Sequence, residues 1–172
     1  GAPDDLRFQG APEGIKFALG ENVKQSNWGD KQVIRYPQSR MGVEQVYMEA
    51  FTRARAYDQS WKAYGQGGKG KIKPRRDLQL ETLAEILNKK RFITCHSYQQ
   101  GEINMLMHVA DTFGFRINTF THILEGYKVA DKMKQHGAAA STFSDWWNYK
   151  MEVVDAIPYN ATIMQRVGVL TA

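Results

Sequence analysis

The sequence predicts an α/β fold built on a parallel sheet. Short apolar or small-residue strands alternate with helices, glycines stand where several helices end, and polar side chains gather where the strands end. Strands that alternate with helices at this spacing require right-handed crossovers, and such crossovers pair the strands in parallel. Strands that are almost continuously apolar are typical of a sheet covered by helices.

The first half of the chain supplies one strand and two helices. Residues 14–20, GIKFALG, form a strand closed by glycine, and residues 41–64 form a long helix after Pro37. The apolar face of this helix comprises Val43, Val46, Tyr47, Ala50 and Phe51. Residues 65–73 form a glycine-rich loop. Pro74 suits the first turn of a second helix, because proline lacks an N–H that would be unpaired there anyway.

The second half repeats a strand–helix rhythm. The strands expected here span residues 91–96, 115–122, 138–143 and 169–172. The helices expected between them span residues 100–114, 126–137 and 160–168, and end at Gly114, Gly137 and Gly168. Residues 169–172 begin a strand that stops with the chain, so we expect four or five strand–helix units of a larger fold. A closed eight-stranded barrel needs about 250 residues.

The composition is that of one globular domain spanning residues 1–172. Hydrophobic residues make up 42% and charged residues 24% of the chain. No apolar run is long enough to cross a bilayer, and the N-terminus shows no signal peptide. A single cysteine, Cys95, excludes an internal disulfide and a multi-cysteine zinc site. We expect a soluble chain of unknown compartment, whose parent protein could be exported or periplasmic.

Part of the net charge of +5 lies in residues 69–76, KGKIKPRR. This stretch could bind phosphate or nucleic acid. It could equally be a solvated loop, and we favour this alternative because no aromatic side chains interleave with the charges as a stacking platform requires. We therefore expect neither nucleic acid nor a membrane as a partner.

Two histidines stand at the ends of successive strands. His96 ends residues 91–96 and His122 ends residues 115–122, one strand–helix unit later. Ligands bind at the carboxyl ends of parallel strands, so two imidazoles there could hold zinc or a similar divalent ion. Alternatively, each is an ordinary strand-end residue bonded to a loop. His108, within a helix, and His136, in a last helical turn, do not belong to this pair.

The stretches FITCHSYQQGEI (residues 92–103), TFTHILEGYKVAD (119–131) and AAASTFSDWWNYK (138–150) resemble the amidohydrolase superfamily. The similarity is to its imidazolonepropionase and Xaa-Pro dipeptidase branch, and covers about strands four to eight of the barrel. It implies a partial (β/α)8 TIM barrel of the metal-dependent hydrolase type, lacking the first strands and the end of the last.

The resemblance also implies a site. His96 and His122 would be ligands on the fifth and sixth strands, for one or two divalent ions, most simply zinc. The fourth strand would add Lys16, carboxylated in some relatives, with Glu21 as the competing candidate. Residues on loops after the strands would bind substrate, namely Tyr98, Ser144, Asp145 and Trp146.

The chain departs from the family in two places. It has no His-x-His pair, and it ends before the eighth-strand aspartate that activates water in the family, so no catalytic base is assigned here. The expected function is a fragment of an amidohydrolase that hydrolyses an amide or cyclic amide C–N bond in a small or dipeptide-like substrate, with the isolated chain inactive. The alternative is a non-catalytic α/β binding or assembly module with a basic loop at residues 69–76. We expect self-association through open sheet edges.

Overall fold

The computed structural model describes residues 2–6, 8–24, 35–67, 70–144 and 150–172. Within these ranges four parallel strands form one sheet in the order β1-β2-β3-β4. The strands are β1 (Gly14–Ala18), β2 (Phe92–His96), β3 (Thr119–Thr121) and β4 (Ala139–Ala140). Thr171 adds a parallel bridge to Ala140, so the predicted start of a further strand lies beside β4. The predicted α/β class with a parallel sheet is confirmed.

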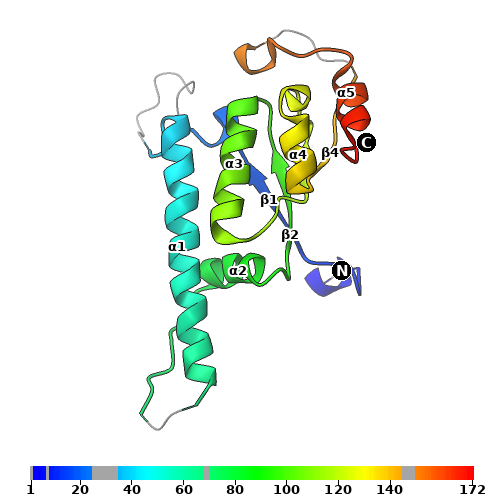
Figure 1. The fold of residues 1–172 in the computed structure, drawn as a ribbon. Coiled ribbons are helices and arrows are strands. Elements are labelled where there is room, and N and C mark those ends of the chain that lie inside the picture. The colour runs from blue at the N-terminus through cyan, green and yellow to red at the C-terminus, as the bar shows by residue number, and fades with distance from the viewer. Residues whose placement is uncertain (1, 7, 25–34, 68–69, 145–149) are drawn as a thin grey trace.

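Five α-helices connect and flank the described strands: α1 (Arg40–Gly65), α2 (Leu78–Leu87), α3 (Gln100–Phe113), α4 (Ala130–His136) and α5 (Asn160–Val167) (Figure 1). Ser39 begins α1 by accepting a hydrogen bond from Gly42 N at 3.1 Å. The last three helices end at Gly114, Gly137 and Gly168, whose φ angles of 77°, 81° and 96° lie in the left-handed region that glycine favours. The three predicted stops are confirmed.

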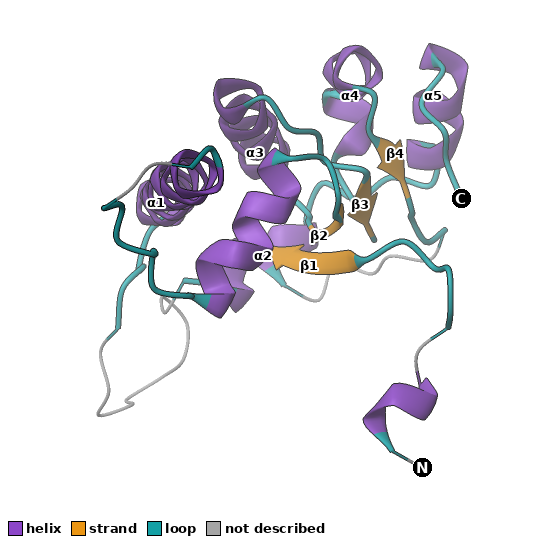
Figure 2. Ribbon diagram, turned by 90° about the horizontal axis from the view of Figure 1, so that it is seen from below, coloured by secondary structure: helices purple, strands orange, loops and turns teal. Residues whose placement is uncertain are grey.

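The sheet separates two environments. Figure 2 shows α1, α3, α4 and α5 on one side of the strands. Side chains alternate between the faces of a strand, so Ile93 and Cys95 of β2 turn toward these helices and both are fully buried. Phe92 and Thr94 turn toward the other side and are exposed. This second side is called the open face below.

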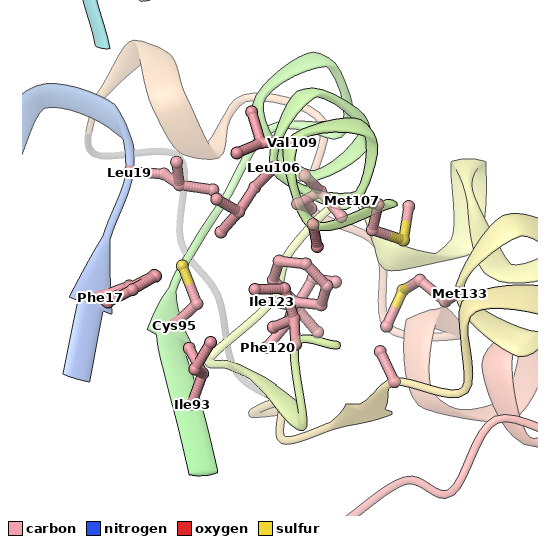
Figure 3. Close-up of a cluster of buried hydrophobic side chains, with 14 of the residues drawn as sticks. Phe17, Leu19, Ile93, Cys95, Leu106, Met107, Val109, Phe120, Ile123 and Met133 are labelled. Carbon is pink, nitrogen blue, oxygen red and sulfur yellow. The ribbon is translucent and has the colours of Figure 1, made fainter. Parts of the chain in front are cut away.

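The hydrophobic core lies between the sheet and α3. Figure 3 shows Phe17 of β1, Cys95 of β2 and Phe120 of β3 turned toward Leu106 and Val109 of α3. Fully burying a side chain of this size contributes about 1.5–3 kcal/mol. The core thus holds the sheet against α3.

Four predicted elements had wrong boundaries. Helix α2 begins at Leu78, not at Pro74, because Asp77 caps it by accepting from Gln79 N at 3.0 Å and Leu80 N at 3.1 Å. The strands expected over residues 115–122 and 138–143 are only three and two residues long. Residues 126–137 divide into the 3₁₀ turn Gly126–Lys128 and α4. None of the described helices is long and apolar enough to cross a membrane.

Candidate functional site

His96 and His122 lie against each other at the carboxyl end of the sheet. His96 is the last residue of β2, and the register pairs it with Thr121, the residue before His122. Nδ1 of His96 and Nε2 of His122 are 2.8 Å apart, and the ring centroids are 4.3 Å apart at an interplanar angle of 75°. The structure therefore brings together the two imidazoles that the sequence places at successive strand ends. Their role as metal ligands stays a prediction.

Both imidazoles are held in the neutral form. Burial, the neighbouring His122, and then the charges of Lys16 and Lys150 lower the pKa of His96 to about 4. The pKa of His122 is also lowered, chiefly by burial. Neutral imidazole is the form that binds a metal ion.

A hydrogen-bond chain crosses the pair. The amide nitrogen Nδ2 of Asn22 donates to Nε2 of His96 at 2.9 Å. Nδ1 of His96 in turn faces Nε2 of His122, and the tautomers of the two rings set which nitrogen donates. Asn22 was not among the predicted site residues. The only sequence feature that pointed to Asn22 was its position four residues after Ala18, the last residue of β1.

The backbone of His122 is strained. Its φ of 42° lies in the left-handed region, where residues other than glycine are uncommon, although histidine occurs there more often than most. Such conformations cluster at sites where a side chain must take a particular direction. This conformation turns the ring of His122 back over the end of β2.

Lys16 lies on the open face, one row below His96. The register pairs Lys16 with Thr94 and Ala18 with His96, which sets the Cα atoms of Lys16 and His96 roughly 8 Å apart by ordinary sheet geometry. Lys16 is exposed, and its charge lowers the pKa of both histidines. The structure thus puts Lys16 near the pair, and its role as a ligand stays a prediction.

Glu21, the competing ligand, lies in the 3₁₀ turn Gly20–Asn22 that follows β1. Its backbone N–H donates to Oε1 of Glu152 at 2.7 Å, so the turn is anchored to the loop before α5. The side chain of Glu21 is half-buried. The choice between Lys16 and Glu21 stays a prediction.

Tyr98 packs against both histidines. Its ring centroid lies 4.8 Å from that of His96 and 5.1 Å from that of His122, and the side chain is buried. On another side, Nζ of Lys150 lies 4.2 Å from the centre of the Tyr98 ring. This contact with the pair is compatible with the predicted place of Tyr98 in the substrate pocket, and Lys150 is a further neighbour that sequence reasoning missed.

Of the other predicted substrate residues, the structure describes only Ser144. Ser144 is exposed, four residues beyond the end of β4. Asp145 and Trp146 lie outside the described residues. His108 is exposed on α3 and His136 stands in the last turn of α4, so neither joins the site.

A buried carboxylate network supports this edge of the sheet. Glu102 and Glu152 are both nearly fully buried. Glu102 pairs with Nε of Arg40 at 2.8 Å, and Glu152 pairs with Nζ of Lys150 at 3.2 Å. Burial raises the pKa of Glu102 against the opposing effect of Arg40. Arg40 and Glu102 thus join α1 to α3, and Glu152, which also accepts from Glu21 N, joins the turn after β1 to residues 150–153.

The nitrogen atoms of the two histidines fit part of a zinc-binding site. Two nitrogens bound to one tetrahedral zinc at about 2.0 Å are about 3.3 Å apart. Nδ1 of His96 and Nε2 of His122 would therefore have to separate by only about 0.5 Å. Among the residues that the structure describes, no three or more histidine, cysteine, aspartate or glutamate side chains form a cluster suited to a metal ion. The pair is thus at most part of a ligand set.

In the described part of the basic loop, three of the charges have local partners. Nζ of Lys71 donates to the carbonyl of Ala63 at 2.7 Å, and Nε of Arg76 donates to Glu81 at 2.7 Å. Nζ of Lys73 lies 5.9 Å from the centre of the Trp61 ring. These contacts tie the stretch to α1 and α2, which favours the interpretation as a solvated loop.

No family model matches the chain. The chain is 26% identical over 154 residues to the curated "Amidohydrolase tasK" of Hapsidospora irregularis, a match that covers 84% of this chain and 15% of that protein. It also matches the crystal structure of an amidohydrolase from Thermotoga maritima MSB8 with a TM-score of 0.80 and 26% identity. That match covers 94% of this chain and 41% of the solved chain. The chain therefore spans less than half the length of either relative.

Proposed function

The chain belongs to the amidohydrolase superfamily, as a segment of that fold, and we propose that its parent protein is a metal-dependent hydrolase of C–N bonds. The observation that carries the proposal is the contact between His96 and His122 at the carboxyl end of a parallel sheet. We further propose an amide, cyclic amide or dipeptide-like substrate, as in the imidazolonepropionase and Xaa-Pro dipeptidase branch.

The roles of this chain's own residues follow from the geometry. His96 and His122 would hold a divalent ion, most simply zinc, because both are neutral and two of their nitrogens converge. Lys16, if carboxylated, or Glu21 would add negative charge and could bridge to a second ion. When bound, the ion supplies Lewis-acid polarisation of the scissile carbonyl and activation of water.

The surroundings would orient the reactants. The ring of Tyr98 limits the movement of both imidazoles and keeps water from one side of the pair. We keep Tyr98, Ser144, Asp145 and Trp146 as the proposed substrate contacts. A catalytic base is not assigned within this chain.

We propose that the isolated 172 residues do not catalyse the reaction. The residues that the structure describes offer two converging imidazoles and one candidate carboxylated lysine or glutamate, whereas a catalytic zinc site uses three protein ligands in a preorganised arrangement and an open position. Weak zinc binding without turnover is therefore the expected behaviour of the chain.

Zinc binding and amide hydrolysis test the proposal. The chain should bind zinc weakly, as a titration with zinc measures, and His96→Ala and His122→Ala should each lose this binding. His108→Ala removes an exposed imidazole elsewhere and should leave zinc binding unchanged. The full-length gene product should hydrolyse an amide or cyclic amide and lose that activity in both site variants. Equal zinc binding by all three variants would overturn the assignment.

A further inference from the structure

We propose that a cavity at the amino ends of the strands binds a phosphate monoester, with Lys89 and Arg116 holding the phosphate group. The cavity measures about 520 Å³ and is lined by residues from the end of α2, the start of β2 and the segment before β3. A volume of this size is typical of a small-molecule site. His96 and His122 lie at the opposite ends of these strands, so the inference is independent of the proposed metal site.

The charged side chains that line the cavity are all cationic, namely Lys89, Arg91 and Arg116. The charge of Arg91 is already neutralised, because its guanidinium pairs with Glu85 at 2.5 Å and with Glu13 at 3.5 Å. Within the part of the chain that the structure describes, the side chains of Lys89 and Arg116 form neither an ion pair nor a hydrogen bond. Two such cations match a phosphate monoester, whose charge is about −1.5 to −2 at neutral pH.

Lys89 stands where the end of a helix favours glycine. Its φ is 60°, its N–H donates to the carbonyl of Ile86 at 2.9 Å, and Lys90 N donates to the carbonyl of Glu85 at 2.8 Å. Glycine is the usual residue in this helix ending, and the chain has glycine at the same place after α3, α4 and α5. A lysine in the left-handed region is strained, and strained residues cluster at ligand sites. A ligand for the Lys89 ammonium accounts for a lysine at this position.

The other walls of the cavity supply a hydrogen-bond donor and an apolar surface. Oδ1 of Asn118 accepts from Ile93 N at 2.8 Å, which fixes the orientation of the amide and leaves Nδ2 as a donor. Phe92, which is exposed, and Phe115, which is buried, also line the cavity. The guanidinium of Arg116 suits phosphate oxygens, and the phenyl rings suit an aromatic group on the ester. We therefore expect an aromatic monoester to bind more tightly than inorganic phosphate.

Titration of the ¹⁵N-labelled chain with phenyl phosphate tests the inference. The backbone amide signals of Gly114 and Asn118, which line the cavity, should shift as the ligand binds. Arg116→Gln should weaken the binding about tenfold or more, as expected for the loss of a hydrogen bond to a charged group. The matched control is Arg53→Gln, which removes an exposed cation of α1 and should leave the affinity unchanged.

Lys89→Gly separates ligand binding from folding. Glycine relieves the left-handed backbone, so the midpoint of urea unfolding should rise, whereas the affinity for phenyl phosphate should fall about tenfold. A purely structural role of Lys89 would leave that affinity unchanged. Wild-type affinity in Arg116→Gln or in Lys89→Gly would overturn the inference, and so would tighter binding of succinate, a dicarboxylate, than of phenyl phosphate.

Discussion

The backbone N–H of Ile117 donates to Nε2 of His136 at 3.1 Å, which ties the segment before β3 to the last turn of α4. Nδ1 of the same ring faces Oδ1 of Asp111 at 3.1 Å. An imidazole that accepts a backbone N–H at one nitrogen is neutral and donates from the other. His136 is therefore a packed polar link between strand and helix.

This link predicts a pH dependence of stability. Burial lowers the pKa of His136, with a smaller contribution from Arg116 in the same direction, and Asp111 opposes the shift. In the unfolded chain the group titrates near about 6.5. Below that pH the unfolded state binds more protons, so the stabilisation is complete above about 6.5 and is lost as the pH falls.

His136→Gln isolates this contribution. Glutamine can still accept from Ile117 N but does not titrate, so the free energy of unfolding should decline less steeply between about pH 7 and pH 5 than in the wild type. Urea unfolding at several pH values measures the slope. His108→Gln, at an exposed position, should keep the wild-type slope. An unchanged slope in His136→Gln would contradict the prediction.

The strained backbone of His122 predicts an unusual order of stability. An L-residue in the left-handed region costs about 1–2 kcal/mol, and glycine avoids that cost. Because the φ of His122 is 42°, we expect His122→Gly to be more stable than His122→Ala by about 1 kcal/mol. Both variants should lose zinc. Chemical denaturation of the two proteins gives the comparison, and an alanine variant that equals or exceeds the glycine variant would count against strain at this residue.

Asn160 is expected to be essential for the loops around the site. Its buried amide donates to the carbonyl of Ile123 at 2.8 Å and to Oγ1 of Thr142 at 3.2 Å, and accepts from Tyr127 N at 2.9 Å. Asn160→Leu keeps the size but leaves Tyr127 N without this acceptor. We expect the free energy of unfolding to fall by about 2 kcal/mol.

Urea unfolding of Asn160→Leu checks this value. Asn104→Leu is the control, because the amide of Asn104 lies on α3 and accepts one hydrogen bond, from Nζ of Lys132 at 2.9 Å. A loss of less than about 0.5 kcal/mol in Asn160→Leu, the range of ordinary surface substitutions, would show that the three hydrogen bonds contribute little.

The open face of the sheet predicts self-association of the isolated chain. Phe92 is 46% exposed there, beside the exposed Thr94 and Lys16 of the same face. Apolar surface and unpaired strand edges favour contact between chains. Sedimentation velocity should show oligomers whose proportion falls in Phe92→Asp. Met41→Asp, an exposed apolar position at the start of α1, should leave the distribution unchanged. A monomeric wild type would refute the prediction.

The units built on strong periodicity could be predicted from sequence. The predicted bounds of β2 and α3 agree with the observed bounds to within one residue, and α3 ends at Gly114 as predicted. The prediction of α3 succeeded because its apolar stripe and its C-terminal glycine indicate the same helix. Strand β3 is shorter than its apolar pattern because the side chain of Asn118 accepts from Ile93 N at 2.8 Å and replaces one ladder bond. This replacement of a backbone hydrogen bond by a side-chain hydrogen bond depends on two residues that are 25 positions apart. A local sequence pattern carries no information about such a pair.

The residues of the candidate site likewise include some that the sequence predicts and some that it does not. His96 and His122 could be found because strand ends are set by the repeat along the chain. Asn22 reaches His96 from the turn after β1, Lys150 lies over the Tyr98 ring, and Glu152 accepts from Glu21 N, and none of these three positions follows from a periodic pattern. Sequence reasoning had no means to place them.

Successive side chains of β2 point to opposite faces of the sheet, and the two sets make different contacts. Ile93 and Cys95 hold the helices against the sheet, whereas Thr94 and His96 occupy the opposite surface. Substitutions at Thr94 or Lys16 should therefore leave the packing of the helices against the sheet intact. In an evolving lineage this arrangement lets chemistry diversify on one surface while selection for a folded chain acts on the other.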